Sequence, residues 1–550
     1  MNIKAISIKK CSHLISLFML VISLAAHGDQ EITTQQRLIS ASNSLKQGSI
    51  TDREQTIQTL ADIGTPSLKI LQALLDGKLL VLKSDAKLVI GKDNNQGYEI
   101  IDALDGSELG NIERSAANKI NLTSMLRTFL RKLISQLELN ADDPSIRLAA
   151  VKVMGNTEDE DTLALLRARV AVEKDEAVQQ AINVVLQLQN INHIDKTIRI
   201  KAIDSLKEQN SHHVVNRLNK IIEKDEAGNH LETDTDITNA AKAALIKINN
   251  RLQFYSAIET VFFGLSLGAV LVLAGIGLAI TFGVMGVINM AHGELMMLGA
   301  YTTYVIQQLM PNHLGISVVL AIPAAFIISG LVGIAIERGI IRFLYGRPLE
   351  TLLATFGVSL ILQQCVRSIF SPLNRSVTTP QWMSGSWQIN DFLSFTWNRL
   401  YILIFCLMVF VLLLQILKRT RLGLEVRAVA QNRNMAKAMG IPTGKVDMMT
   451  FGLGSGIAGI AGVALSQITN VGPNLGQAYI VDSFMVVVFG GVGNLWGTLV
   501  AGFVLGIANK FLEPFAGAVL AKILVLVFII LFIQKRPRGL FPQKGRIADS

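Results

Sequence analysis

The sequence is poor in cysteine and has no recognisable metal-binding pattern. Its 550 residues include three cysteines, Cys11, Cys365 and Cys406. The first lies in the N-terminal apolar run and the other two lie in apolar segments, so residues 27–253 contain no cysteine at all. That region cannot form a disulfide and must be held together by its own core. No Cys/His spacing typical of a metal site is present, so the sequence predicts no metal.

The chain also lacks the motifs of an enzyme. The nearest approach to the phosphate-binding loop G-x-x-x-x-G-K-[ST] runs from Gly440 to Lys445, with the wrong spacing and no Ser or Thr after the lysine. No nucleophile–base signature and no Gly-rich phosphate loop occurs in residues 27–253. We therefore expect a protein that is not itself an enzyme and requires no cofactor.

What is present is a strong contrast between two halves. Residues 27–253 are rich in Asp, Glu, Lys, Asn and Gln, whereas Leu, Ile, Val, Gly, Ala and Phe dominate from residue 254 to residue 534. The formal charge of +9 does not indicate nucleic acid, because membrane proteins collect Lys and Arg in cytoplasmic loops. We predict a soluble domain over 27–253, a membrane domain over 254–535 and a cytoplasmic tail over 536–550.

The first 26 residues have the composition of a signal peptide. Lys4, Lys9 and Lys10 precede a short apolar run that ends in the small residues Ala25 and Ala26. An uncleaved anchor helix is the alternative. Either segment exports the soluble domain, which is then periplasmic in a cell with two membranes.

Apolar spacing predicts that the soluble domain is mainly helical. Residues 31–76 form two helices with a break at Pro66, and residues 77–110 alternate in the manner of a small β-meander. Four later segments share an acidic start followed by an Ala-containing apolar helix: 143–155, 175–187, 195–207 and 236–248. They resemble stacked HEAT-type helical pairs, and an ordinary helical domain is the alternative.

The second half predicts an all-α polytopic membrane protein with about eight or nine transmembrane helices, because a span needs about 20 apolar residues. The 483–512 stretch is interrupted by glycines and fits one tilted span, a re-entrant pair or two short spans. The candidate spans are 256–283, 293–310, 316–337, 351–370, 399–417, 448–470, 483–512 and 517–534.

Loop charges predict the orientation. Lys and Arg cluster after the third span, in the 418–447 loop and at the C-terminus, which places these sites in the cytoplasm. The 371–398 loop holds Trp382, Trp387 and Trp397 but Arg375 alone among basic residues, so it lies outside. An exported N-terminal domain and a cytoplasmic C-terminus require an odd number of crossings, which favours two spans within 483–512.

Polar residues interrupt the apolar pattern near residue 290. Asn289, His292 and Glu294 follow Gly286 and are succeeded at once by apolar residues. Polar groups at membrane depth mark functional sites by default, and an interrupted helix that lines a cavity tolerates them. The alternative is a short cytoplasmic turn in which Asn and His cap helix ends. We predict that these three residues line a translocation pathway.

A second interruption lies at GGVGNLWG, residues 490–497. Most glycines of the membrane half fall at spacings that allow helices to pack closely. Four glycines within eight residues, however, disfavour a continuous helix. We predict an interrupted helix near the pathway, with four candidate residues: Gly490, Gly491, Gly493 and Asn494.

The basic 418–447 loop contains a helix-compatible stretch from Glu425 to Met439, ended by Gly440 and then Pro442. One face of this helix is apolar and the other positions are basic or amidic. A short amphipathic helix of this kind can lie at the membrane surface.

Three segments carry a family resemblance: INMAHGELMMLGAY from residue 288, FGLGSGIAGIAGV from residue 451, and GGVGNLWG. They resemble the membrane permeases of branched-chain amino-acid-type ABC importers, and the resemblance covers roughly residues 255–545. The older EAA pattern of ABC permeases is absent. The resemblance implies that the 418–447 loop carries a coupling helix that docks on the ATPase, with seven candidate residues: Glu425, Arg427, Val429, Ala430, Arg433, Ala436 and Gly440.

The resemblance also implies partners and a substrate. The partners are a second, related permease in a heterodimer, two ABC ATPase subunits and an extracytoplasmic solute-binding protein, in a bacterial inner membrane. The polar extension, with GKLLVLKSDAKLVIG from residue 77, most resembles urea-importer permeases. Urea is thus the expected solute, ahead of short-chain amides and branched-chain amino acids.

Two other functional classes are alternatives. A channel or secondary transporter would use charged residues within the membrane, but the charged residues of this half lie near span ends, where snorkelling accounts for them: Glu337, Asp482, Lys510 and Glu513. A sensor or assembly protein would need far fewer glycine-rich spans than this chain contains.

Overall fold

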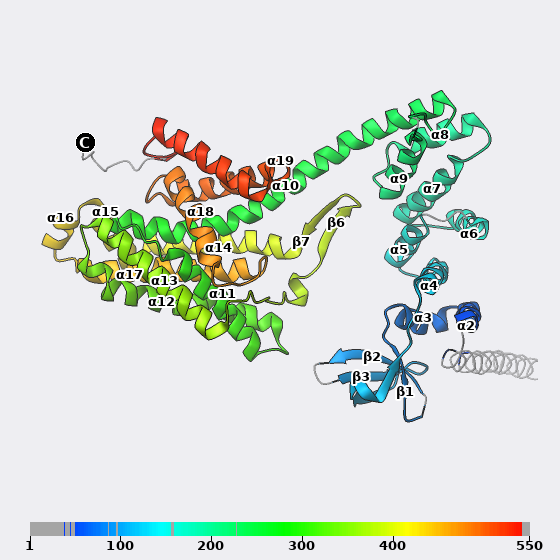
Figure 1. Cartoon of the computed structure of the whole chain (residues 1–550), viewed down its shortest axis with the longest axis horizontal. Coiled ribbons are helices and arrows are strands. Elements are labelled where there is room, and N and C mark those ends of the chain that lie inside the picture. The colour runs from blue at the N-terminus through cyan, green and yellow to red at the C-terminus, as the bar shows by residue number, and fades with distance from the viewer. Residues whose placement is uncertain are drawn as a thin grey trace, which may run out of the picture. The chain divides into compact units, whose positions relative to one another are not determined.

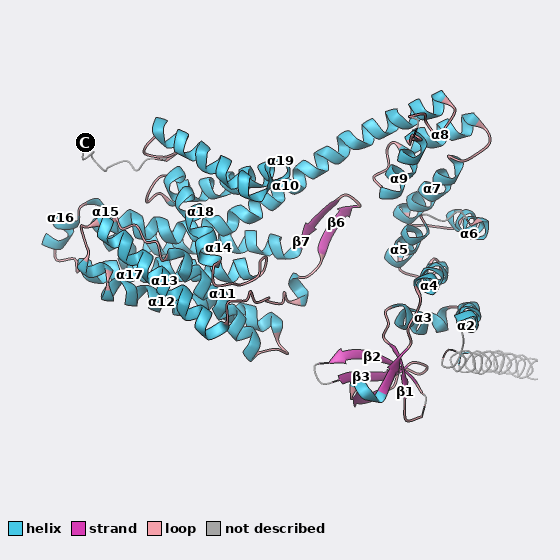
Figure 2. Ribbon diagram, viewed as in Figure 1, coloured by secondary structure: helices cyan, strands magenta, loops and turns pink. Residues whose placement is uncertain are grey.

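The computed structural model describes Leu38, Leu45 and residues 50–541, apart from residues 86, 95–96, 156–158 and 227. The predicted signal peptide and the last nine residues of the tail lie outside the described residues. The chain divides into two compact units, Met1–Ile248 and Asn249–Ser550. The first contains helices and a small sheet, and the second is helical apart from one hairpin (Figure 1, Figure 2).

The first unit begins with two helices, α2 (Ile50–Ile63) and α3 (Leu68–Leu75), separated by the 3-10 turn Thr65–Ser67. Gly64 adopts φ +90°, a left-handed conformation that glycine reaches without strain, and Pro66 follows inside the turn. The predicted break at Pro66 is therefore confirmed.

A five-stranded antiparallel sheet follows, in the order β4-β3-β2-β1-β5. The predicted meander is confirmed as the first four strands. The sheet extends beyond residue 110, however, because a fifth strand returns to pair with β1, and such long-range pairing leaves no local sequence signal. The strands are β1 (Leu79–Leu82), β2 (Leu88–Asn94), β3 (Gly97–Asp102), β4 (Glu108–Ile112) and β5 (Ala117–Lys119).

The acidic residues that open the first three sequence repeats are helix N-caps, whereas Asp236, which opens the fourth, lies in the first turn of a helix that begins at Thr235. The side chains of Asp143, Asp175 and Asp195 accept hydrogen bonds from backbone N–H groups of the helices that follow them. The helices of this part are α4 (Ser124–Glu138), α5 (Pro144–Met154), α6 (Glu160–Val170), α7 (Glu176–Asn190), α8 (Lys196–Leu206) and α9 (His212–Ile222).

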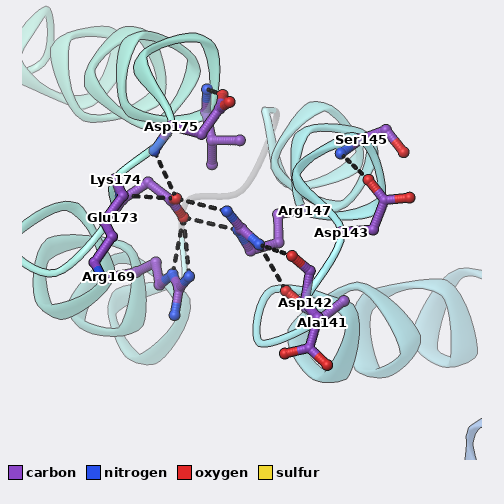
Figure 3. A network of polar contacts seen from close by, with 10 residues as sticks. Ala141, Asp142, Asp143, Ser145, Arg147, Arg169, Glu173, Lys174 and Asp175 are labelled. Atoms are coloured by element: carbon purple, nitrogen blue, oxygen red, sulfur yellow. Dashed lines mark hydrogen bonds and ion pairs between the residues drawn. The ribbon is translucent and has the colours of Figure 1, made fainter.

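A buried ion pair connects these helices (Figure 3). Arg147 of α5 donates from Nε and Nη2 to the two carboxylate oxygens of Glu173, at 2.9 and 2.7 Å. Its Nη1 donates to the carbonyl oxygens of Ala141 and Asp142, both at 2.8 Å, beyond the end of α4. Each charged group is thereby hydrogen-bonded, which buried charges require.

The same arrangement recurs in the third of the repeated segments. Arg199 of α8 donates from Nε to the carbonyl oxygen of Ile191, at 2.6 Å, and pairs with the carboxylate of Glu232. Glu232 lies two residues before Asp234, whose side chain accepts a 2.8 Å hydrogen bond from the N–H of Asp236. Glu173 has the same position relative to its own capping aspartate. These two repeated sequence segments therefore share the same Arg–Glu ion pair and the same aspartate N-cap.

The second unit is a bundle of helices. Six described helices are long and apolar enough to cross a membrane: α10, α12, α13, α14, α17 and α19. The principal helices are α10 (Thr235–Met285), α11 (His292–Leu309), α12 (Leu314–Gly339), α13 (Pro348–Phe370), α14 (Trp397–Arg419), α17 (Thr443–Ser466), α18 (Leu475–Gly490) and α19 (Leu495–Lys535).

The ambiguous 483–512 stretch is not one helix. α18 ends at Gly490 and α19 begins at Leu495. The stretch therefore contains a helix break and is not a single tilted span. The backbone of α19 is itself non-helical at Gly517, with φ 75° and ψ 162°. Both breaks occur where glycine allows a conformation that other residues rarely adopt.

Glycines let the central helices α11, α12 and α17 lie side by side (Figure 1). A Cβ added to Gly299 of α11 would lie 2.0 Å from the carbonyl oxygen of Gly459 in α17. A Cβ on Gly462 would lie 1.9 Å from the carbonyl oxygen of Met296. Close packing, expected for most membrane glycines, explains these positions.

The bundle has two different ends (Figure 1). At one end, the hairpin of β6 (Ser386–Asn390) and β7 (Leu393–Thr396) leads into α14. Trp387 and Trp397 stack there with ring centroids 6.3 Å apart, as expected for an interfacial aromatic belt. At the other end of α14 lie α15 (Arg421–Gln431) and α16 (Arg433–Ala438) in the basic loop.

The helix predicted over Glu425–Met439 is corrected to two helices. Asn432 has an extended backbone, with φ −151° and ψ 99°, and ends α15. Its side chain accepts a 2.9 Å hydrogen bond from the N–H of Met435 and so caps α16. An asparagine can compete with the helix for backbone hydrogen bonds in this way. Gly440, at φ +85°, ends the segment as expected.

Candidate functional site

The polar interruption is a break between α10 and α11. α10 ends at Met285, Gly286 takes φ +67°, and α11 does not begin until His292. Asn289 lies within the break with none of its surface exposed, and its Oδ1 accepts a 3.0 Å hydrogen bond from the N–H of Ala291. The side chain of Asn289 is therefore enclosed by protein.

His292 shows how far the chain turns back. Its Nε2 hydrogen-bonds to the carbonyl oxygen of Ala274, at 3.0 Å. Ala274 lies inside α10, about 16 Å before the helix ends at Met285. α11 therefore starts beside the interior of α10 and within the thickness of the bundle.

The side chain of Glu294, in the first turn of α11, is hydrogen-bonded to residues in the middle of α13. Its Oε1 accepts hydrogen bonds from Nε2 of Gln363, at 2.7 Å, and from Oγ of Ser359, at 3.1 Å. Ser359 lies midway between Pro348 and Phe370, the two ends of a helix long enough to span the hydrocarbon core. The carboxyl group, 1% exposed, thus lies level with the middle of α13.

The partners of this segment form a polar stripe on α13, which we define as Thr351, Thr355, Ser359 and Gln363. Their spacing of four residues puts all four on one helix face, and each is at most 3% exposed. Oγ1 of Thr355 accepts a 3.1 Å hydrogen bond from the N–H of Met290 within the break. The sequence interpretation missed the stripe, although its pattern T-x3-T-x3-S-x3-Q was available as a signal.

A second helix N-terminus reaches the same point. A Cβ on Gly293 of α11 would lie 2.3 Å from the carbonyl oxygen of Gly476, the second residue of α18. A Cβ on Gly476 would lie 2.6 Å from Oε2 of Glu294. The first turns of α11 and α18 therefore meet at this carboxyl group, and helix N-termini carry partial positive charge. No local pattern in the sequence indicated this meeting.

Three buried side-chain atoms in the break and in the first turn of α11 have no hydrogen-bond partner among the described residues: Asn289 Nδ2, His292 Nδ1 and Glu294 Oε2. Leaving a buried polar group unsatisfied costs about 1–3 kcal/mol. These atoms offer hydrogen-bonding capacity to a small polar solute or to water.

The glycine turn lies elsewhere. Gly490 ends α18, about 21 Å along the helix from Gly476. Gly491 and Gly493 have φ +104° and +77°, and Asn494 caps α19 while donating from Nδ2 to the carbonyl oxygen of Phe541. The structure thus does not bring these four candidates to Glu294; it places them at the end of the bundle beside the C-terminal segment.

The coupling candidates divide into two groups. Val429 and Ala436 are buried against Val426 and Val446, so they face the helical bundle itself. Glu425 and Ala430 are half-buried, whereas Arg427 and Gly440 are exposed. The sequence interpretation overlooked the exposed apolar residues of this segment, Leu424, Met435 and Met439.

Arg433 also points inward. Its guanidinium pairs with the carboxylate of Asp447, donates a 2.7 Å hydrogen bond to the hydroxyl of Tyr345 and lies 3.7 Å from that ring's centroid. Tyr345 belongs to the loop between α12 and α13, and Asp447 to the first turns of α17. Arg433 therefore links α16 to α17 and to the loop between α12 and α13.

Comparison with known families decides the class of protein. The family model described as branched-chain amino acid transport system / permease component matches residues 260–533. The chain belongs to this permease family. The match includes the break, the polar stripe and the first turn of α18, and it identifies the permease as the membrane subunit of an ABC-type transporter rather than an enzyme.

Known relatives match the same half. The permease is 30% identical over 298 residues to the high-affinity branched-chain amino acid transport system permease protein LivH of Salmonella typhimurium, covering 52% of this chain and 96% of that protein. It is 26% identical over 298 residues to the corresponding protein BraD of Pseudomonas aeruginosa, with coverage of 52% and 96%.

A shorter match relates the permease to the probable branched-chain amino acid transport permease protein LivM of Methanocaldococcus jannaschii, 29% identical over 163 residues, or 27% of this chain and 47% of that protein. No solved structure matches the chain. The alignments that cover almost all of LivH and BraD leave nearly half of this permease unmatched.

Proposed function

We propose that this permease forms the membrane pathway of an ATP-driven importer for a small, neutral, hydrogen-bonding solute, and that the solute is urea. One observation carries the proposal: a buried carboxyl level with the middle of α13, with a free oxygen, lies between a polar stripe and two helix N-termini. Buried ionisable groups in membrane segments mark substrate pathways by default. Discontinuous helices near the midplane are a recurrent way to build transporter sites.

The chemistry of the site matches an amide-like solute. Urea presents several N–H donors and one carbonyl acceptor, which correspond to Oε2 of Glu294 and Nδ2 of Asn289. The polar stripe adds hydroxyl and amide groups. One turn beyond Gln363 on the same helix, Arg367 hydrogen-bonds to Asn474 at the N-terminus of α18. This cation could also meet the carboxylate of a zwitterionic amino acid, so the match to urea rests on the hydrogen-bonding groups of Glu294 and Asn289.

Branched-chain amino acids are the alternative solute, since the relatives LivH and BraD carry that description. The unmatched N-terminal half distinguishes this permease from both. We assign residues 27–253 to the periplasm as a HEAT-like domain after a signal peptide at 1–26, the membrane domain to 254–535 of a bacterial inner membrane, and 536–550 to the cytoplasm.

The importer is completed by other subunits. We propose a second, related permease, two ABC ATPases and a solute-binding protein. The ATPase docks on the exposed side of α15 and α16, where Leu424, Met435 and Met439 present apolar surface in a basic loop. The buried candidates Val429 and Ala436 support this surface from beneath.

Uptake of labelled urea and labelled leucine at micromolar concentration tests the proposal, in cells with and without the gene. Loss of energy-dependent urea uptake alone supports it. Loss of leucine uptake alone keeps the permease and replaces the solute. If both activities persist in the deletion strain, the importer proposal for these two solutes is wrong.

A further inference from the structure

A cavity of about 790 Å³ opens at the end of the bundle that carries α15. Four segments far apart in sequence surround it: the last turns of α10, the end of α14, one side of α15, and the glycine turn with the C-terminal segment. Its apolar lining includes Ala279, Ile280, Val284, Leu414 and Leu417. None of the residues assigned to the solute pathway near Glu294 lines it.

The rim of the cavity is cationic. Lys418 at the end of α14 and Arg427 of α15 both line it, and no Asp or Glu does. Both side chains are exposed, and neither forms an ion pair with any residue that the structure describes. Nε of Arg427 hydrogen-bonds only to the carbonyl oxygen of Gly423, at 3.2 Å, which leaves its charge uncompensated.

The cavity lies at the boundary between membrane and cytoplasm. Its apolar part lies between membrane helices, while its rim belongs to the basic loop that the charge pattern places in the cytoplasm. Trp496, 54% exposed, also lines it, and its ring lies against Phe410 with centroids 5.2 Å apart.

We propose that this cavity binds an anionic phospholipid of the cytoplasmic leaflet. One acyl chain fills the apolar part, and the phosphate meets Lys418 and Arg427. Basic pockets between membrane helices on the cytoplasmic side recognise acidic headgroups in this manner. The lipid would join α15, which carries the coupling segment, to the end of α10, which precedes the break. The inference concerns a separate site and does not depend on the solute.

Native mass spectrometry of the purified full-length chain tests the proposal, after detergent exchange and incubation with vesicles of equal phosphatidylglycerol and phosphatidylcholine. We expect selective retention of phosphatidylglycerol. Lys418→Ala with Arg427→Ala should lower that retention about 10–30-fold, as two basic contacts are lost. Val284→Trp, which keeps both cations and fills the apolar part, should lower it as well.

The control is Lys437→Ala, which removes an exposed cation of the same loop outside the cavity and should leave retention unchanged. Equal retention of both lipids, or an equal loss in Lys437→Ala, would overturn the proposal in favour of general surface charge. Displacement of the lipid by millimolar inorganic phosphate would reduce the site to a small-anion site. If the bound ATPase abolished retention of phosphatidylglycerol, the cavity would belong to the ATPase interface, and the proposal of a lipid site would be wrong.

Discussion

Gln363 in the middle of α13 donates a 2.7 Å hydrogen bond to Oε1 of Glu294 in the first turn of α11. The two residues lie on different helices and both are almost fully buried. The bond occupies one carboxylate oxygen and leaves the other without a partner in the described structure. This asymmetry makes Glu294 both a fixed element of the fold and an available acceptor.

Glu294→Gln should lower solute uptake about tenfold at unchanged membrane abundance, because an amide has half the acceptor capacity and losing one buried acceptor costs about 1–3 kcal/mol. Initial uptake rates normalised to permease on immunoblots measure the effect. Glu337→Gln is the matched control, since Glu337 is 3% exposed but lies near the end of α12, away from the polar stripe. Equal uptake in the two variants would remove Glu294 from the pathway.

Thr355→Val should destabilise the permease and reduce uptake, because it leaves the partly buried N–H of Met290 without its acceptor, at a cost of about 1 kcal/mol. Thr355→Ser keeps the hydroxyl and should restore both properties. Thermal unfolding in detergent and uptake are measured together. A valine variant as stable as the serine variant would show that this bond does not hold the break.

Gly293→Ala should prevent normal assembly, since the new Cβ would lie 2.3 Å from the carbonyl oxygen of Gly476 and backbone cannot easily move away. Gly357→Ala on α13 is the control. No atom lies within 4 Å of its added Cβ, and alanine favours a helix by about 1 kcal/mol over glycine. Membrane abundance and melting temperature should fall for the first and not for the second. Similar behaviour of both variants would argue against the close contact of α11 with α18.

Glu173→Gln should destabilise the first unit by about 3–5 kcal/mol, because it leaves Arg147 as a buried charge without its partner. Glu160→Gln, which disrupts the exposed pair with Arg167, should cost less than about 1 kcal/mol. Protease susceptibility of residues 141–175 in the full chain at neutral pH distinguishes the two. Equal susceptibility would show that the buried pair does not stabilise this unit.

The same carboxyl group predicts acid sensitivity. Hydrogen bonding from Arg147 lowers the pKa of Glu173 from 4.5 to about 2. Since the folded-state pKa is the lower one, the stabilisation is complete above pH 4.5 and is lost as the pH falls toward 2. Brief pepsin digestion across this interval should show the wild type approaching the susceptibility of Glu173→Gln. A constant difference between them down to pH 2 would contradict the assignment.

Met439→Asp should uncouple ATP hydrolysis from uptake without lowering permease abundance, since Met439 is 77% exposed on the proposed docking surface. Ala436→Asp should reduce abundance instead, because it places a charge among Val426, Val429 and Val446. ATPase activity and uptake of the reconstituted transporter, compared with immunoblots, separate the two effects. Full transport by Met439→Asp would remove this surface from the ATPase interface.

Several elements followed from local sequence. The apolar runs predicted a polytopic helical domain, although six described helices are long and apolar enough to span a membrane where eight or nine were expected. Pro66 marked the first helix break, and the aspartates that open the first three repeats became N-caps. These features depend on interactions within a few residues or on the hydrophobic period, both of which can be read along the chain. The prediction of one continuous coupling helix was wrong at Asn432. The side chain of this residue accepts a backbone hydrogen bond and so starts a second helix.

The sequence by itself determined the class of protein: apolar runs indicated a polytopic membrane domain, and the segments that start at residues 288, 451 and 490 carried the resemblance to transporter permeases. The tertiary structure alone decided which polar residues meet. It joined Glu294 to the stripe on α13 and to the first turn of α18, and it placed the glycine turn about 21 Å away along α18. The physical reason is that helix periodicity records which face is apolar, whereas contacts between helices depend on packing, which no local pattern records.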